Sequence, residues 1–115
     1  MKKPRGRCFH FAALLDENGN AINAKWSVPN VCCAERRILQ DYETLPSKST
    51  IVVVQYRVRR GSVSIGRSEP CDKCRIAMIN SGVERVIYST RNDGKVEMCS
   101  ACPTDLKPSG YSALF

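Results

Sequence analysis

The chain has 115 residues, of which 43% are hydrophobic and 25% charged. This is the size of one domain and a composition that excludes a disordered chain. No apolar run reaches the length of about 18 residues that a membrane span needs, so we expect no membrane partner. Seven cysteines, an odd number, exclude a complete intramolecular disulfide framework. Because no apolar signal-peptide core follows the basic N-terminus, we expect a cytoplasmic protein whose thiols are metal ligands or buried side chains.

The first half of the chain predicts a hairpin and then a helix. An apolar, strand-forming run covers residues 8–15, and a second candidate strand covers 21–26. The Asn-Gly pair between them is a strong hairpin signal. Pro29 and Asn30 end the second strand, and a helix is predicted from about residue 31 to 42.

The second half predicts two buried strands on either side of a helix. The β-branched run that begins at Ile51 continues with alternation through Val58, as in a strand covered on both faces. A shorter strand is predicted over residues 62–65 and a helix over 72–81, where Gly82 is the natural stop. Residues 83–89 predict another strand, and the last twenty or so residues remain unassigned.

This order of elements indicates an α/β fold. We expect a central mixed sheet of about five strands with helices on both faces. Residues 1–7 are predicted to be a flexible basic leader, and residues 8–115 a single domain.

Three cysteines at two predicted helix starts indicate a metal site. Cys71 and Cys74 in the segment PCDKC are three residues apart, so both reach one ion from the first turn of a helix. Cys33 supplies a third thiolate from the other helix start. Three protein ligands leave the fourth tetrahedral position open for water, which predicts one catalytic Zn²⁺ per chain. Cys32 is an alternative to Cys33, but the spacing to the acidic residue Glu35 favours Cys33.

Glu35 is the predicted catalytic residue. It lies two residues after Cys33, and regular helical spacing does not bring such a pair together. We therefore expect Cys33 at an irregular helix start, with the Glu35 carboxylate beside the zinc and able to transfer protons. Because three thiolates leave Zn²⁺ with a net negative charge, Arg36 and Arg75 are predicted to donate hydrogen bonds to the sulfurs.

These motifs resemble those of a known enzyme family. The segment C-A-E-R that begins at Cys33 is similar to the first zinc motif of free-nucleoside cytidine deaminases, and S-E-P-C-D-K-C from Ser68 to Cys74 resembles the second. The likeness to the cytidine/deoxycytidylate deaminase superfamily covers residues 8–90. It implies a three-layer cytidine-deaminase-like fold, zinc-dependent hydrolytic deamination, and an arginine, Arg36, that hydrogen-bonds the thiolates.

The resemblance also implies how a substrate binds. The backbone amide of Ala34 would bind the base carbonyl, and a backbone carbonyl near Ser68 and Glu69 would receive the departing amine. Asn23 resembles an asparagine that contacts the sugar in many members, although the ribose motif around it is not reproduced. From its position in the sequence, Trp26 is a candidate for stacking at the mouth of the pocket.

The basic residues bear on the choice of substrate. They favour phosphate-bearing ligands, although a solvated surface has the same composition. We expect a free cytosine nucleoside or nucleotide, with a base in single-stranded DNA or RNA as the alternative. Family members of this size are usually oligomers, so a homo-oligomer is expected. The two basic clusters are Lys2, Lys3, Arg5 and Arg7, and Arg57, Arg59, Arg60 and Arg67.

Other residues of the chain are also candidate metal ligands. A second C-x-x-C motif near the C-terminus would allow a structural zinc ribbon, and on a basic chain a non-catalytic nucleic-acid-binding module. That interpretation leaves Glu35 unexplained and requires that residues 72–81 form no helix. The single histidine, His10, lies on a predicted strand and is expected to be structural. The four ribbon cysteines would be Cys71, Cys74, Cys99 and Cys102.

Overall fold

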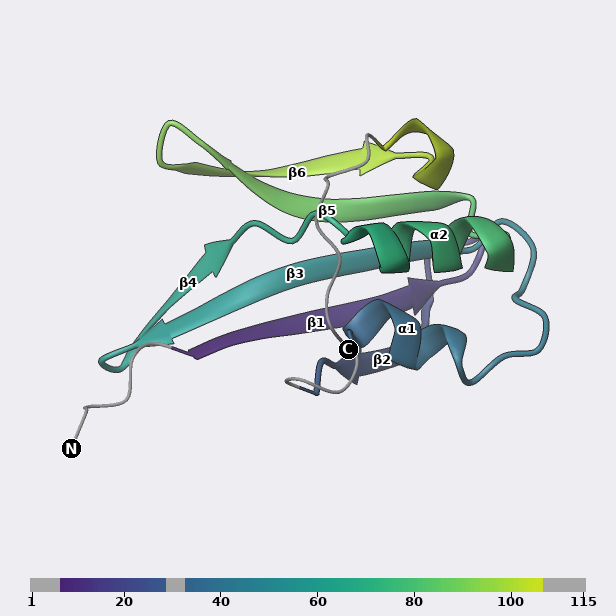
Figure 1. Ribbon diagram of the computed structural model, residues 1–115, viewed down its shortest axis with the longest axis horizontal. Helices are drawn as coiled ribbons and strands as arrows, with labels where there is room; N and C mark the ends of the chain where they lie inside the picture. The colour runs from purple at the N-terminus through teal and green to yellow at the C-terminus, as the bar shows by residue number, and fades with distance from the viewer. Residues whose placement is uncertain (1–6, 29–32, 107–115) are drawn as a thin grey trace.

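The computed structural model describes residues 7–28 and 33–106, which form one mixed six-stranded sheet and two α-helices (Figure 1). Neither helix has the length and apolar composition that crossing a membrane requires. In chain order the elements are β1 (Arg7–Leu15), β2 (Ala21–Trp26), α1 (Ala34–Leu39), β3 (Thr50–Arg59), β4 (Ser62–Gly66), α2 (Asp72–Ser81), β5 (Arg85–Asn92), β6 (Lys95–Ala101) and a 3₁₀ turn, η1 (Pro103–Asp105).

The sheet is mixed because one of its connections crosses over. Its strands lie in the order β2-β1-β3-β5-β6, and β4 pairs with the outer half of β3. β3 and β5 are parallel, and α2 lies in the connection between them, whereas the other pairs are antiparallel. A parallel pair needs such a crossover, since a short turn joins only antiparallel neighbours.

One of the two helices has the predicted boundaries and the other is shorter than predicted. α2 covers Asp72–Ser81 as predicted and ends at Gly82, whose φ of 81° is the left-handed conformation that glycine adopts readily. α1 is shorter than the predicted helix over 31–42. Its N-cap, Cys33, is extended, and past its end the amide of Asp41 bonds the carbonyl of Ile38 in a tighter turn. Residues 31 and 32 lie outside the described part of the chain.

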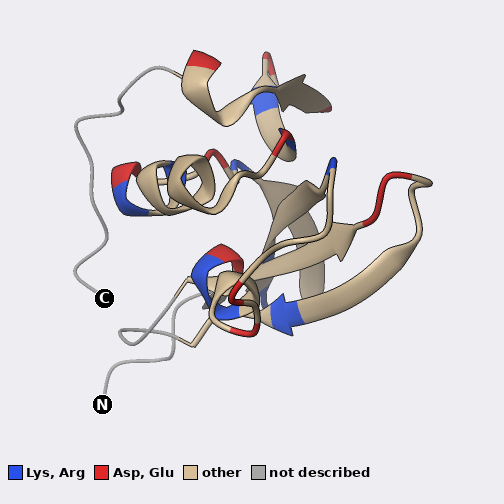
Figure 2. Cartoon of the chain, turned by 90° about the vertical axis from the view of Figure 1, so that its right-hand side faces the viewer, with Lys and Arg blue, Asp and Glu red and all other residues tan. Residues whose placement is uncertain are grey.

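The apolar core lies between the sheet and the helices. Alternate strand residues face it, because side chains of a strand point to opposite faces in turn. The two helices pack against each other on this face, as Figures 1 and 2 both show. Fully buried core residues are Ala12, Leu14, Ile51, Val53 and Val86 from the sheet, and Ala34, Ile38, Cys74 and Met78 from the helices.

The opposite face of the sheet differs from the expectation. The predicted α/β class and mixed sheet are confirmed, but both described helices lie on one face of the sheet and leave the other face uncovered. On this uncovered face, Trp26 makes edge contacts with the rings of Phe9 and Phe11 and a tilted contact with Tyr56. Among the described residues six large hydrophobic side chains are exposed, and by strand alternation five of them lie on this uncovered face, 42% to 64% exposed: Ile22, Trp26, Val63, Val96 and Met98.

We predict that α2 contributes to stability chiefly through its buried side. Met78→Ala should lower the free energy of unfolding by about 2–5 kcal/mol, because Met78 is completely buried. Ile76→Ala, on the same helix but half exposed, is the matched control and should change it far less. Urea unfolding followed by circular dichroism measures both. Equal losses would show that α2 does not pack as described.

Candidate metal centre

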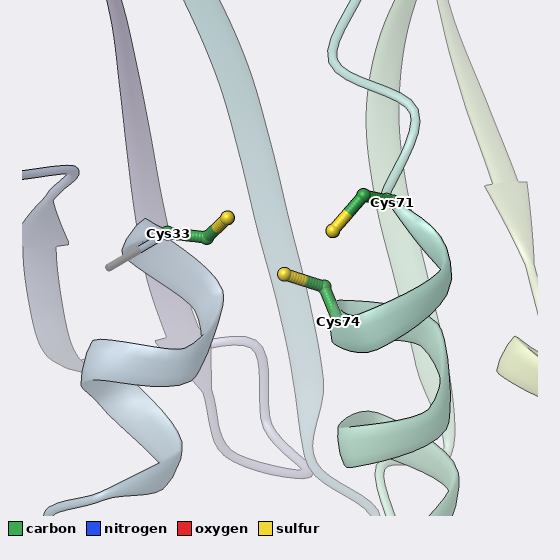
Figure 3. A group of neighbouring side chains, drawn as sticks. All are labelled: Cys33, Cys71 and Cys74. Atoms are coloured by element: carbon green, nitrogen blue, oxygen red, sulfur yellow. The ribbon is translucent and has the colours of Figure 1, made fainter. Parts of the chain in front are cut away.

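Three sulfur atoms meet where the two helices begin. Cys33 is the N-cap of α1, Cys71 is the N-cap of α2, and Cys74 lies in the first turn of α2. Their Sγ atoms all lie within 4.8 Å of one another, and Figure 3 shows them converging from the two helices. Cys33 has an extended backbone with ψ of 151°, which is the irregular helix start that its spacing to Glu35 predicted.

The donor set fits zinc. Zn–S bonds of about 2.3 Å in a tetrahedron place neighbouring sulfurs about 3.8 Å apart, so small shifts from the observed spacing are sufficient. Hydrogen bonding to Cys71 raises the pKa of the Cys33 thiol to about 11, and contacts with Cys33 and Cys71 raise the pKa of Cys74. Three thiolates this close repel one another, and a bound cation removes that repulsion. The cluster therefore fits one zinc ion per chain.

One of the two predicted arginines reaches the sulfurs. The Nη2 group of Arg36 lies 3.7 Å from Cys33 Sγ and donates to it. The Nε atom of Arg75 is buried and has no hydrogen-bond partner in the described part of the chain. The predicted bond from Arg75 to the thiolates therefore has no support at that atom. Arg36 lies on α1, the helix that carries Cys33, so sequence spacing was sufficient to place it.

Glu35 is buried beside the cluster. It is 4% exposed and lies in the first turn of α1. Burial raises the pKa of its carboxyl to about 7, and the charge of Cys71 adds to this, whereas interactions with Arg36 and Cys74 oppose it. Cys71 and Cys74 therefore both act on this carboxyl from α2. A buried carboxyl whose pKa lies near neutrality can both accept and return a proton.

Ala34 lies in α1 next to Cys33, and Ser68 lies in the segment that leads to Cys71. Ala34 is buried between Cys33 and Glu35, in a first turn whose amides have no partner within the helix. The Ser68 hydroxyl donates to the carbonyl of Val53 at 2.7 Å, and the Ser68 amide donates to the carbonyl of Ser89 at 2.8 Å. Ser68 thus ties the segment that leads to Cys71 to both β3 and β5, while Glu69 is exposed.

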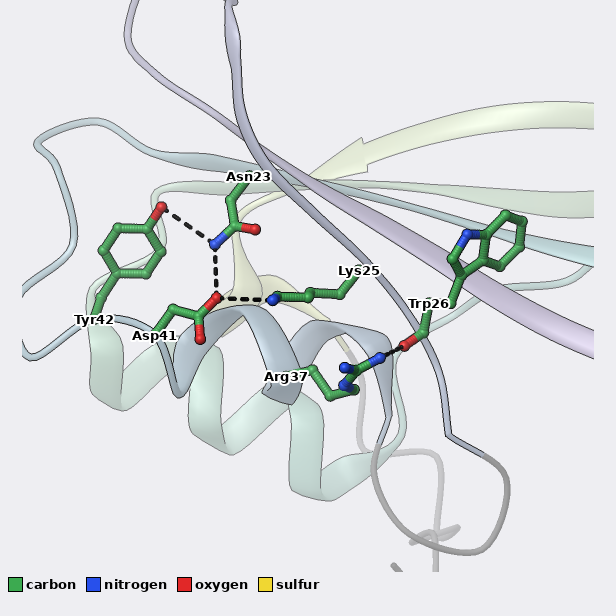
Figure 4. Close-up of polar contacts among 6 residues, drawn as sticks. All are labelled: Asn23, Lys25, Trp26, Arg37, Asp41 and Tyr42. Atoms are coloured by element: carbon green, nitrogen blue, oxygen red, sulfur yellow. Dashed lines mark hydrogen bonds and ion pairs between the residues drawn. The ribbon is translucent and has the colours of Figure 1, made fainter.

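Asn23 points toward the other end of α1. Its side-chain amide donates to Asp41 at 3.0 Å and to the Tyr42 hydroxyl at 3.4 Å, and Lys25 forms an ion pair with Asp41 at 3.3 Å (Figure 4). These contacts join β2 to the C-terminal end of α1, whereas Cys33 lies at its beginning. The predicted contact of Asn23 with a sugar therefore has no support in this arrangement.

Trp26 lies away from the metal cluster. Its carbonyl accepts a hydrogen bond from Arg37 on α1, while its ring points to the opposite side of the strand (Figure 4). There it packs on Phe11. The expectation that Trp26 stacks on a substrate at the pocket mouth therefore has no support in this arrangement, because the ring lies on the face of the sheet that the described helices leave uncovered.

Sequence reasoning missed a polar row on the helix-covered face. Strand register places His10 beside Gln55, and Gln55 beside Gly66. Although His10 is distant in sequence from both cysteine motifs, the charge of Cys71 acts on its ring, where burial lowers the pKa. Only the pairing of β1 with β3 brings these residues together. The alternation of β1 places His10 on the same face as Ala12, which was the one available signal.

The second C-x-x-C motif does not join the cluster. Residues 72–81 form a helix, and Cys102 Sγ lies 3.3 Å from the carbonyl of Glu84, close to the end of α2 where the chain enters β5. Ten helical residues separate this point from Cys71 by about 15 Å. Among the described residues the metal-binding group is Cys33, Cys71 and Cys74, so the zinc-ribbon interpretation is wrong.

Comparison with known proteins agrees with this geometry. Residues 8–90 match the family model described as cytidine and deoxycytidylate deaminase zinc-binding region. No curated protein matches the chain.

We predict that one zinc ion depends on all three cysteines. Cys33→Ala should abolish stoichiometric zinc and lower the melting temperature of the metal-loaded protein, because the ion stabilises only the folded form. Cys102→Ala, at an exposed thiol outside the cluster, is the control and should retain one zinc. Metal content by mass spectrometry and thermal melts check both. Zinc retained in Cys33→Ala but lost in Cys102→Ala would restore the ribbon.

Proposed function

The chain belongs to the cytidine and deoxycytidylate deaminase family, and on this premise we propose that it hydrolyses the exocyclic amine of a cytosine nucleoside or nucleotide. The reaction consumes water and yields the uracil product and ammonia. The observation that carries the proposal is the buried Glu35 carboxyl beside three sulfurs that fit zinc. A structural zinc site needs no such acid.

The residues around the cluster would divide the work. When bound, Zn²⁺ lowers the pKa of water and so supplies a nucleophile at neutral pH. Glu35 would take a proton from the attacking water and pass it to the ring nitrogen. It would then take the second proton of that water, from the hydroxyl group now on the base carbon, and deliver it to the amine as the carbon–nitrogen bond breaks and ammonia leaves. Arg36 would keep Cys33 in place as a ligand and offset part of the thiolate charge.

The base would be held by backbone groups on both sides of the cluster. The amide of Ala34 is available in the first turn of α1 and would bind the base carbonyl. A carbonyl near Ser68 and Glu69 would accept a hydrogen bond from the leaving amine. The hydrogen bonds of Ser68 to β3 and β5 support this role, because they fix the backbone of that segment relative to the sheet.

A base within single-stranded DNA or RNA remains the other candidate substrate. The basic residues fit both kinds of substrate, but a polynucleotide reader usually adds an aromatic ring that stacks on the bases, and the ring of Trp26 lies on the opposite face from the cluster. We therefore favour the free nucleoside or nucleotide. The two substrates differ in their response to salt, since a polynucleotide contacts many phosphates and a free nucleoside none.

We predict that Glu35→Gln keeps the fold and the zinc but lowers turnover by about 10²- to 10⁴-fold, the usual contribution of a positioned acid–base group. Glu43→Gln is the control, since Glu43 is an exposed carboxylate. Ammonia release, zinc content and circular dichroism are measured for both variants. Deamination by Glu35→Gln at the wild-type rate would remove Glu35 from the mechanism.

The substrate is identified by a product screen with the zinc-loaded protein. Cytidine, deoxycytidine, their monophosphates, adenosine, guanine, and single-stranded DNA and RNA are each assayed for ammonia and for the changed base. We expect turnover of a free cytosine compound that changes little between low and high salt. Turnover confined to an oligonucleotide and lost steeply with added salt would establish the alternative substrate.

A further inference from the structure

A row of polar side chains, His10, Gln55 and Arg57, lies on the sheet near the starts of the two helices. On this face of β1 and β3, His10 and Gln55 follow the core residues Ala12 and Val53, and Arg57 follows Gln55. Each such step along a strand advances about 7 Å. β3 extends beyond the helix starts toward the β3–β4 hairpin (Figure 1), and Arg57 lies in this outer part of β3, which pairs with β4.

The hydrogen bonds between α1 and β2 locate the metal cluster above this row. Arg37 bonds the carbonyl of Trp26, so the second turn of α1 lies level with Trp26, Phe11 and Val54. Cys33 precedes Arg37 by one helical turn, about 6 Å. It therefore lies one to two residues further along β1, near the level of His10 and Phe9.

The segment that leads into the second helix is bonded to the same part of β3. Ser68 is bonded to Val53, and Cys71 follows three residues later. The influence of the Cys71 charge on the His10 ring agrees with this placement. The row thus begins beneath the cluster and continues outward along β3 to Arg57.

The members of the row are held in a fixed order. Gln55 Oε1 accepts a hydrogen bond from Arg57 Nε at 3.0 Å, and Gln55 Nε2 lies 3.5 Å from His10 Nε2. Gly66 on β4 makes room for this arrangement. A Cβ atom at Gly66 would lie 2.7 Å from Arg57 Nε and even closer to Gln55 Oε1. Gln55 thus positions the guanidinium through Nε and leaves the terminal amino groups of Arg57 without a hydrogen bond to another described residue.

We infer that Arg57 binds the 5′-phosphate of a cytosine nucleoside monophosphate whose base lies at the metal cluster. The inference rests on the proposed deaminase function and narrows its substrate class. A guanidinium fork matches the oxygens of a phosphate. Between Gln55 beneath the cluster and Arg57, β3 advances about 7 Å, which leaves room for a ribose between base and phosphate. His10 and Gln55 would form the floor beneath the sugar.

The test compares monophosphate and nucleoside on the zinc-loaded protein. Arg57→Ala should lower kcat/KM for CMP or dCMP about 10- to 100-fold, the loss of a charge-assisted hydrogen bond, and leave cytidine or deoxycytidine within about twofold. Gln55→Ala should lower the ratio of the two kcat/KM values to a smaller extent, because it removes only the support of the guanidinium. The matched control is Arg59→Ala, an exposed arginine two residues further along β3, which should leave the ratio unchanged.

Calorimetric titration with CMP and cytidine separates this inference from the proposed function. Tighter binding of CMP than of cytidine, abolished by Arg57→Ala, supports the phosphate site even if neither compound is deaminated. Equal binding of both compounds overturns the site while deamination of cytidine upholds the function. Equal losses of kcat/KM on both substrates in Arg57→Ala also overturn the phosphate site. A loss of activity confined to an oligonucleotide with one cytosine overturns it as well, since the phosphate bound would then belong to a polynucleotide.

Discussion

The metal site depends on one constraint: the two helices must begin at the same level along the strands of the sheet. Cys33 and Cys71 cap α1 and α2, and their sulfurs meet that of Cys74 within 4.8 Å. A slip of α1 by one residue would move its sulfur about 1.5 Å along the axis and turn it by about a quarter of a turn. The arrangement of the strands is what holds the two helix starts level.

Each helix is tied to the sheet by hydrogen bonds. For α1, Arg37 in its last turn bonds the carbonyl of Trp26, and Asp41 just past its end accepts from Asn23. For α2, Ser68 bonds β3 just before the helix, and the amide of Glu84 bonds Ser49 just after it. Buried Ile38 and Met78 fill the space beneath the two helices. Stability and metal geometry therefore come from the same contacts.

The features that the sequence predicted are those with a local cause. Proline before Cys71 and glycine after Ser81 fixed both ends of α2, and the spacing of Cys33 and Glu35 already required an irregular helix start. The contacts of Asn23 and Trp26 were not predictable, because the directions of these side chains depend on strand alternation and on partners far along the chain. His10 was missed for the same reason, since only the register of β1 with β3 brings it beside Gln55. β6 was left unassigned because Lys95–Ala101 carries little hydrophobic periodicity and is exposed along most of its length.

The two sides of the cluster come from well-separated parts of the chain, and this makes the ion a cross-link. With metal bound, the segment from Cys33 to Cys71, which contains α1, β3 and β4, becomes a closed loop. In the chain-entropy account, closing a loop of this size with a covalent bridge stabilises a fold by about 4 kcal/mol. Among the described residues Cys33 is the only ligand on its side of that loop, whereas Cys71 and Cys74 share the other. Losing the single sulfur on α1 therefore opens the loop as completely as losing both sulfurs on α2.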